Sequence, residues 1–111
     1  MSKTIVQTSG APAAIGPYSQ GASTGQLVFT AGQLGLDPAT GAMAEGIEAQ
    51  TERALQNVQA ILEAAGTRLE NVVKVTVFLA DMGDFKAMNG VYSRFFPDAP
   101  PARSAIQAGA L

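Results

Sequence analysis

The stretch Pro97-Asp98-Ala99-Pro100-Pro101-Ala102-Arg103-Ser104-Ala105-Ile106-Gln107 places one guanidinium near the start of an otherwise mostly apolar segment. Proline lacks a backbone donor and keeps the residue before it extended, so residues 97–101 indicate a stiff approach to a strand that starts near Ala102. Arginine stays charged, and its planar fork of donors fits a carboxylate or a phosphate. From this stretch alone, a surface ion pair with one of the nine acidic residues is the simpler interpretation of Arg103.

The composition limits what the chain can do. Its 111 residues suffice for one domain with a single hydrophobic core. Only 14% of the residues are charged, and such a lightly charged surface permits burial in an oligomer. The net charge of -2 offers no basic field, so a nucleic acid is disfavoured as the partner. The absence of cysteine and histidine excludes disulfides, thiolate nucleophiles, imidazole bases and the usual zinc ligands.

The location is inferred from segments that the sequence does not contain. No stretch has the apolar run of a signal peptide or the length of a membrane span. We therefore expect a cytoplasmic protein, in a reducing compartment, with no membrane partner.

Strand patterns occur in both halves of the chain. Residues 3–8 and 72–80 are predicted as strands, and residues 20–24 and 27–34 as a hairpin around a glycine turn. Gly32 falls in the second strand of this hairpin. Glycine weakens a strand, so Gly32 indicates either a bulge or a ligand that approaches the backbone closely.

Two segments have helical spacing. The first is predicted over residues 47–65, with Gly66 as its stop, and the second over residues 85–95. Asn89 lies on or beside the apolar stripe of the second helix. A side-chain amide so near the core needs partners, and a structural hydrogen bond to a neighbouring loop is the simpler explanation.

Tyr18 follows Gly16-Pro17 in a loop over residues 11–21, whose prolines and glycines rule out a regular helix. A stiff backbone at this position would aim the Tyr18 hydroxyl at a ligand. An ordinary half-buried tyrosine is the alternative.

Several motifs follow one another in a characteristic order: Ile15-Gly16-Pro17-Tyr18-Ser19-Gln20-Gly21, Phe29-Thr30-Ala31-Gly32-Gln33, Asn57-Val58, Val75-Thr76-Val77-Phe78-Leu79-Ala80-Asp81, Asn89-Gly90-Val91-Tyr92, Phe95-Phe96 and Pro101-Ala102-Arg103-Ser104. Together they closely resemble the Rid family, also called YjgF/YER, which contains reactive-intermediate deaminases. The resemblance covers essentially the whole chain and predicts one Rid-like domain over residues 1–111.

The resemblance implies an α+β fold of the chorismate-mutase-like type, with a mixed sheet and two helices packed on one face. It also implies a homotrimer with active sites in clefts between subunits. Family members continue past the equivalent of Leu111 into a further strand, which carries a glutamate that positions the attacking water. We therefore expect this sequence to lack the last strand of the family, and no residue of it is assigned the catalytic role of that glutamate.

The substrate that the resemblance implies is a 2-imino acid or its enamine, such as 2-iminobutanoate or 2-iminopropanoate. Arg103 matches the family arginine that binds the substrate carboxylate, while Tyr18 and Asn89 match residues beside the substrate. Gly32 and Ala105 match positions whose backbone groups reach the ligand. No cofactor is expected, because an iminium is already electrophilic and needs only orientation and an activated water.

Two departures from the family pattern occur: Ala31 where a serine is frequent, and Ala105 where some members have cysteine. The main alternative function is a non-catalytic member of the same fold that binds a small carboxylate. Ribonuclease activity or translation inhibition, attached to some relatives, is less expected because of the acidic balance and the lack of histidine.

Overall fold

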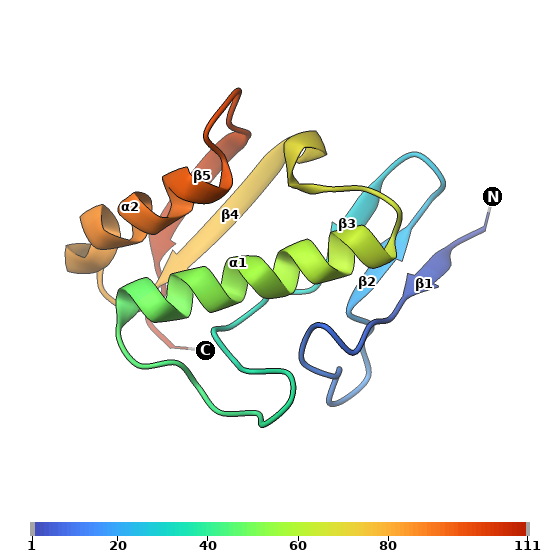
Figure 1. The fold of residues 1–111 in the computed structure, drawn as a ribbon, viewed down its shortest axis with the longest axis horizontal. Coiled ribbons are helices and arrows are strands. Elements are labelled where there is room, and N and C mark those ends of the chain that lie inside the picture. The colour runs from blue at the N-terminus through green and yellow to red at the C-terminus, as the bar shows by residue number, and fades with distance from the viewer. Residues whose placement is uncertain (1, 111) are drawn as a thin grey trace.

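The computed structural model describes residues 2–110 as an α+β fold of two layers, with helices in front of strands in Figure 1. The strands are β1 (Thr4–Val6), β2 (Gly21–Ser23), β3 (Val28–Thr30), β4 (Lys74–Leu79) and β5 (Ala102–Gln107). The helices are α1 (Ile47–Ala64) and α2 (Phe85–Phe95), with short 3-10 turns η1 (Leu69–Asn71) and η2 (Met82–Asp84).

The strands pair in two separate sets. β1, β2 and β3 form an antiparallel sheet in that order, and β4 pairs in parallel with β5. The predicted α+β class, with two helices and both senses of strand pairing, is confirmed. Among residues 2–110 no backbone ladder joins the two sets. The homotrimer and the lack of the family's last strand in this sequence stay predictions.

Both helices contribute to one core. The apolar side chains of α1, α2 and β4 meet there because each element carries apolar residues at its own period. The buried members of this cluster are Leu55, Leu62, Leu69, Leu79, Met88, Tyr92 and Phe96. The predicted stop of α1 is also confirmed: Gly66 has a φ of 87°, and its N–H donates to the carbonyl of Glu63.

The strands of the N-terminal sheet are shorter than predicted, since each spans three residues. The prediction that Gly32 lies in a strand is wrong, because β3 ends at Thr30. A Cβ atom at Gly32 would meet no atom within 4 Å. Packing inside this chain therefore does not require glycine at that position, and its backbone is open to approach from outside.

A buried amide anchors the loop that follows β3. Asn57 of α1 is 0% exposed, and its Nδ2 donates to the carbonyl oxygens of Leu34 (3.0 Å) and Leu36 (2.9 Å). Arg53 donates to Oδ1 of Asn57 through Nε (3.1 Å) and Nη2 (2.9 Å). Because the arginine occupies the oxygen, the amide nitrogen must face the loop, and this fixes the path of the chain after Gly32.

Gly21 lies where β2 meets α1, and it gives a test of this packing. A Cβ at Gly21 would lie 2.9 Å from Cγ2 of Ile61 and 3.1 Å from the carbonyl oxygen of Phe29. Gly21→Ala should therefore push β2 away from α1 and lower the free energy of unfolding by about 1–3 kcal/mol in urea denaturation.

Gly90→Ala is the matched control, because a Cβ at Gly90 meets no atom within 4 Å. Alanine at this exposed helical position should raise the free energy of unfolding by up to about 1 kcal/mol. Unchanged stability in Gly21→Ala would contradict the close contact between β2 and α1.

Candidate functional site

Arg103 is surrounded by three neutral side chains of α2. Its Nη1 donates to Oδ1 of Asn89 at 2.6 Å. Its Cζ lies 4.7 Å from the ring centre of Tyr92 and 5.3 Å from that of Phe85. Positions 85, 89 and 92 are spaced by four and three residues, so one face of the helix supplies all three groups. The alternative partner for Asn89, a neighbouring loop, is replaced by an arginine of β5.

The register of β5 explains how an arginine reaches this helix. Arg103 pairs with Val75 of β4, and Ala105 pairs with Val77. Both valines pack against the core under the helices, and residues paired across a ladder point to the same side of the sheet. The guanidinium and Ala105 therefore both face the helical layer.

Within the part of the chain that the structure describes, no acidic side chain neutralises Arg103. The single ion pair within residues 2–110 joins Arg68 and Glu70 on the surface. The surface ion pair considered for Arg103 from its sequence context is therefore not formed. Its Nε and Nη2 have no acceptor in the described part of the chain. A partly buried cation with unused donors is a group that an anion can bind.

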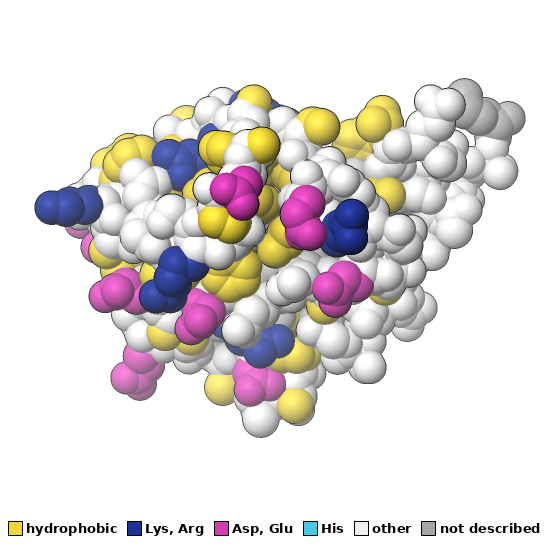
Figure 2. All heavy atoms as spheres, turned by 45° about the horizontal axis from the view of Figure 1, so that its top comes forward, with side chains coloured by type: hydrophobic (Ala, Val, Ile, Leu, Met, Phe, Trp, Pro, Cys, Tyr) yellow, Lys and Arg dark blue, Asp and Glu magenta, His cyan; other side chains and the backbone are white. Residues whose placement is uncertain are grey.

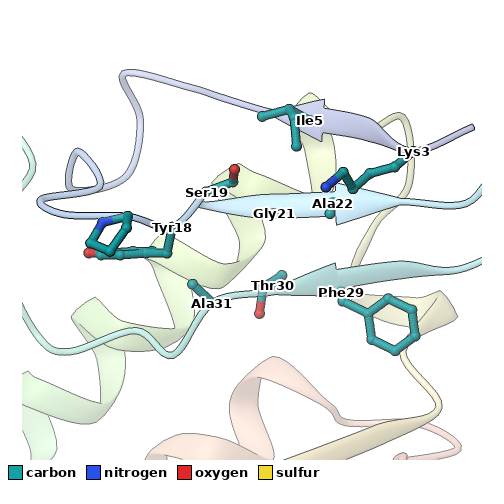
Figure 3. Close-up of a pocket in the computed structure, with 10 residues that line it drawn as sticks. Lys3, Ile5, Tyr18, Ser19, Gly21, Ala22, Phe29, Thr30 and Ala31 are labelled. Atoms are coloured by element: carbon teal, nitrogen blue, oxygen red, sulfur yellow. The ribbon is translucent and has the colours of Figure 1, made fainter.

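Tyr18 lies in a different part of the molecule. It lines an open groove of about 400 Å³ on the N-terminal sheet, together with Thr30 and Ala31 (Figure 3). Tyr18 is 52% exposed, and its hydroxyl oxygen accepts a hydrogen bond from the backbone N–H of Ile15 at 3.3 Å. Arg103 and Asn89 are absent from the residues lining this groove.

The site residues predicted from the sequence thus fall into two groups. Arg103, Asn89 and Ala105 belong to the region where β5 faces α2. Tyr18 lines the groove, and Gly32 follows its lining residue Ala31 in the chain. Within residues 2–110 no hydrogen bond or cation–π contact joins the two groups.

The loop that carries Tyr18 is fixed by Gln20, which is 3% exposed. Its Oε1 accepts from the N–H of Thr8 at 2.7 Å. Its Nε2 donates to the carbonyl oxygens of Thr8 (3.0 Å), Ala11 (3.2 Å) and Pro12 (2.8 Å). This role was not predicted, because a single glutamine beside a strand gives no periodic signal.

Tyr92 is a site neighbour that ends the motif Asn89-Gly90-Val91-Tyr92 but received no role of its own from the sequence. It is 7% exposed, and burial raises the pKa of its hydroxyl, an effect that the positive charge of Arg103 partly offsets. The hydroxyl has no hydrogen-bond partner in the described part of the chain. Only the register of β5 could have revealed that this ring lies against Arg103.

Residues 2–110 bring together no group of three or more histidine, cysteine, aspartate or glutamate side chains that could hold a metal ion. None of the helices in this range has the length and apolar character needed to cross a membrane.

Known proteins resemble this chain over nearly its full length. The sequence profile of the endoribonuclease L-PSP family matches residues 8–111. A Salmonella typhimurium protein named 2-iminobutanoate/2-iminopropanoate deaminase is 49% identical, over 100% of this chain and 88% of its own. The crystal structure of E. coli TdcF with bound serine has a TM-score of 0.94 at 41% identity, covering 97% of this chain and 87% of that one. RidA from the Antarctic bacterium Psychrobacter has a TM-score of 0.94 at 45% identity, with 97% and 88% covered.

The raised pKa of Tyr92 predicts a loss of stability in alkaline solution. The unfolded chain loses the phenolic proton near pH ~10, before the folded protein does, so the free energy of unfolding falls as the pH rises above that value. This fall should be steeper in the wild type than in Tyr92→Phe, as measured by urea unfolding at increasing pH. The same pH dependence in both proteins would mean that Tyr92 titrates like a free phenol.

Proposed function

Because the chain belongs to the Rid family, whose profile carries the description endoribonuclease L-PSP, we propose that it hydrolyses 2-imino acids and their enamines to 2-oxo acids and ammonia. The observation that carries this proposal is the uncompensated charge of Arg103 beside Asn89. A 2-imino acid carries a carboxylate next to its reactive carbon, so a fixed cation that binds the carboxylate also positions the reactive carbon. The name of the Salmonella typhimurium relative supports 2-iminobutanoate and 2-iminopropanoate as substrates.

In the proposed reaction Arg103 binds the carboxylate through the donors that Asn89 leaves unused. Water then adds to the carbon of the protonated C=N bond. One proton passes from the added oxygen to the nitrogen, the C–N bond then breaks, and the remaining hydroxyl proton passes to the departing ammonia, so that the products are a 2-oxo acid and ammonium. The protonated imine is itself an electron acceptor, so the reaction needs orientation and a positioned water more than a strong acid. We assign the water-activating role to no residue of this chain.

Three further residues complete the proposed substrate site: Tyr18, Gly32 and Ala105. The open space at Gly32 suits close approach of a ligand to its backbone. Tyr18 and Arg103 do not meet within one chain, and this separation supports a site shared between two copies. In the proposed homotrimer, Tyr18 of one subunit would line the cleft that holds Arg103 of another.

The activity is tested by generating the imine in the assay with an amino-acid oxidase or a threonine dehydratase. Semicarbazide traps the free imine, and an active deaminase competes with the trap. Ammonia leaves in either route, so the protein should lower the rate at which the trapped product forms and raise the rate at which the free 2-oxo acid forms. Unchanged trapping in the presence of stoichiometric protein would contradict the proposal.

Arg103→Ala tests the role of the guanidinium. Loss of a charged hydrogen-bonding group should lower kcat/KM for the imine by about 10- to 150-fold, mainly through a higher KM. Arg94→Ala is the control, because it removes the same charge from an exposed position in the last turn of α2. Equal losses in the two variants would mean that net charge, and not binding by Arg103, determines the rate.

Carboxylate binding without hydrolysis is the second candidate function. It is favoured by a cation whose charge no acid among residues 2–110 neutralises, and by the lack of an assigned water-activating group. Calorimetry with 2-oxobutanoate separates the two functions, since binding that Arg103→Ala abolishes, without any turnover of the imine, would identify a binding protein.

Ribonuclease activity is not proposed, although the family description names it. The net charge is -2 and the sequence has no histidine. Figure 2 shows acidic and basic side chains interspersed on the face turned to the viewer, without a continuous basic area there. RNA binding normally draws on such an area and weakens with salt.

A further inference from the structure

We propose that Tyr92 is a positioning residue, whose ring holds the guanidinium of Arg103 so that its unused donors face the substrate carboxylate. This inference rests on the proposed function of the same site. It gives a role to a residue that the sequence placed only at the end of the motif Asn89-Gly90-Val91-Tyr92.

The hydrogen bond to Asn89 cannot fix Arg103 by itself. It uses one N–H of Nη1, and a planar group held at one corner can still rotate. A cation within about 6 Å of a ring centre is attracted to the electron-rich face of the ring. The rings of Tyr92 and Phe85 both satisfy this distance, and the ring of Tyr92 is nearer, at 4.7 Å against 5.3 Å for Phe85.

An aromatic ring suits this task better than an acid would. A carboxylate would bind the N–H edge of Arg103 and compete with the substrate for the same donors. A ring contacts the face of the guanidinium and leaves its edge available. Tyr92 is also 7% exposed and belongs to the core cluster, so the ring is held firmly by its surroundings.

The hydroxyl of Tyr92 is not needed for this role, because it has no hydrogen-bond partner in the described part of the chain. Tyr92→Phe should therefore keep the positioning, whereas Tyr92→Leu should lose it. Phe96 offers a matched control. It is also 7% exposed in the same cluster, and its ring centre lies 4.8 Å from that of Tyr92, but it makes no cation–π contact with Arg103.

The test measures the Kd of 2-oxobutanoate by calorimetry and the KM and kcat of the imine reaction. Tyr92→Leu should raise Kd and KM together by about 5- to 20-fold, with a much smaller change in kcat, and Tyr92→Phe should restore both constants to within about twofold of the wild type. Phe96→Leu should lower the Tm about as much as Tyr92→Leu does, yet leave Kd unchanged.

Equal increases of Kd in Tyr92→Leu and Phe96→Leu would show a purely structural contact and overturn the inference. Wild-type affinity in Tyr92→Leu would overturn it as well, while the proposed function still stood. A wild-type protein that neither binds 2-oxobutanoate nor hydrolyses the imine would overturn the proposed function, and this inference with it.

Discussion

The parallel pairing of β5 with β4 is the contact on which the candidate site depends. Val75 lies opposite Arg103, and the valine packs into the core under the helices. A shift of β5 by one residue would turn Arg103 to the opposite face of the sheet and bring Ser104 toward α2. The apolar packing of β4 therefore fixes the direction in which the arginine points, and α2 then supplies the groups that receive it.

Neutral side-chain amides form the hydrogen bonds that hold two loops and Arg103 in place. Gln20 holds the loop before β2, Asn57 holds the loop after β3, and Asn89 holds Arg103. An amide both donates and accepts, so a single side chain can satisfy several backbone groups in a loop without bringing a charge into the interior. This use of amides agrees with a chain in which only 14% of residues are charged.

Local features of the sequence predicted the helices well. The bounds of α2 agree with the prediction, and α1 ends within one residue of it, because apolar spacing and the stop at Gly66 are properties of neighbouring residues. The end of β3 at Thr30 was not predicted, since it depends on how the following loop is held by Asn57 of a distant helix.

The same distinction applies to the site. Arg103 and Asn89 were identified singly, through motifs that resemble the family, but no spacing rule predicts that they bond to each other across 14 positions. Their contact follows from the strand register and from the packing of α2, both of which are long-range. The separation of Tyr18 from Arg103 follows from the arrangement of the two sheets, which sequence patterns do not encode locally.

The neutral surroundings of Arg103 also have a consequence for selectivity. An arginine paired with an acid has little attraction for other anions, because its charge is already neutralised. An arginine held by an amide and two rings attracts any small anion that reaches it. Chloride and phosphate in the surrounding solution are therefore competitors for the same donors. Charge alone gives little discrimination among them, so preference for an organic acid must come from the planar fork, which matches a carboxylate, and from apolar contact with the rest of the ligand.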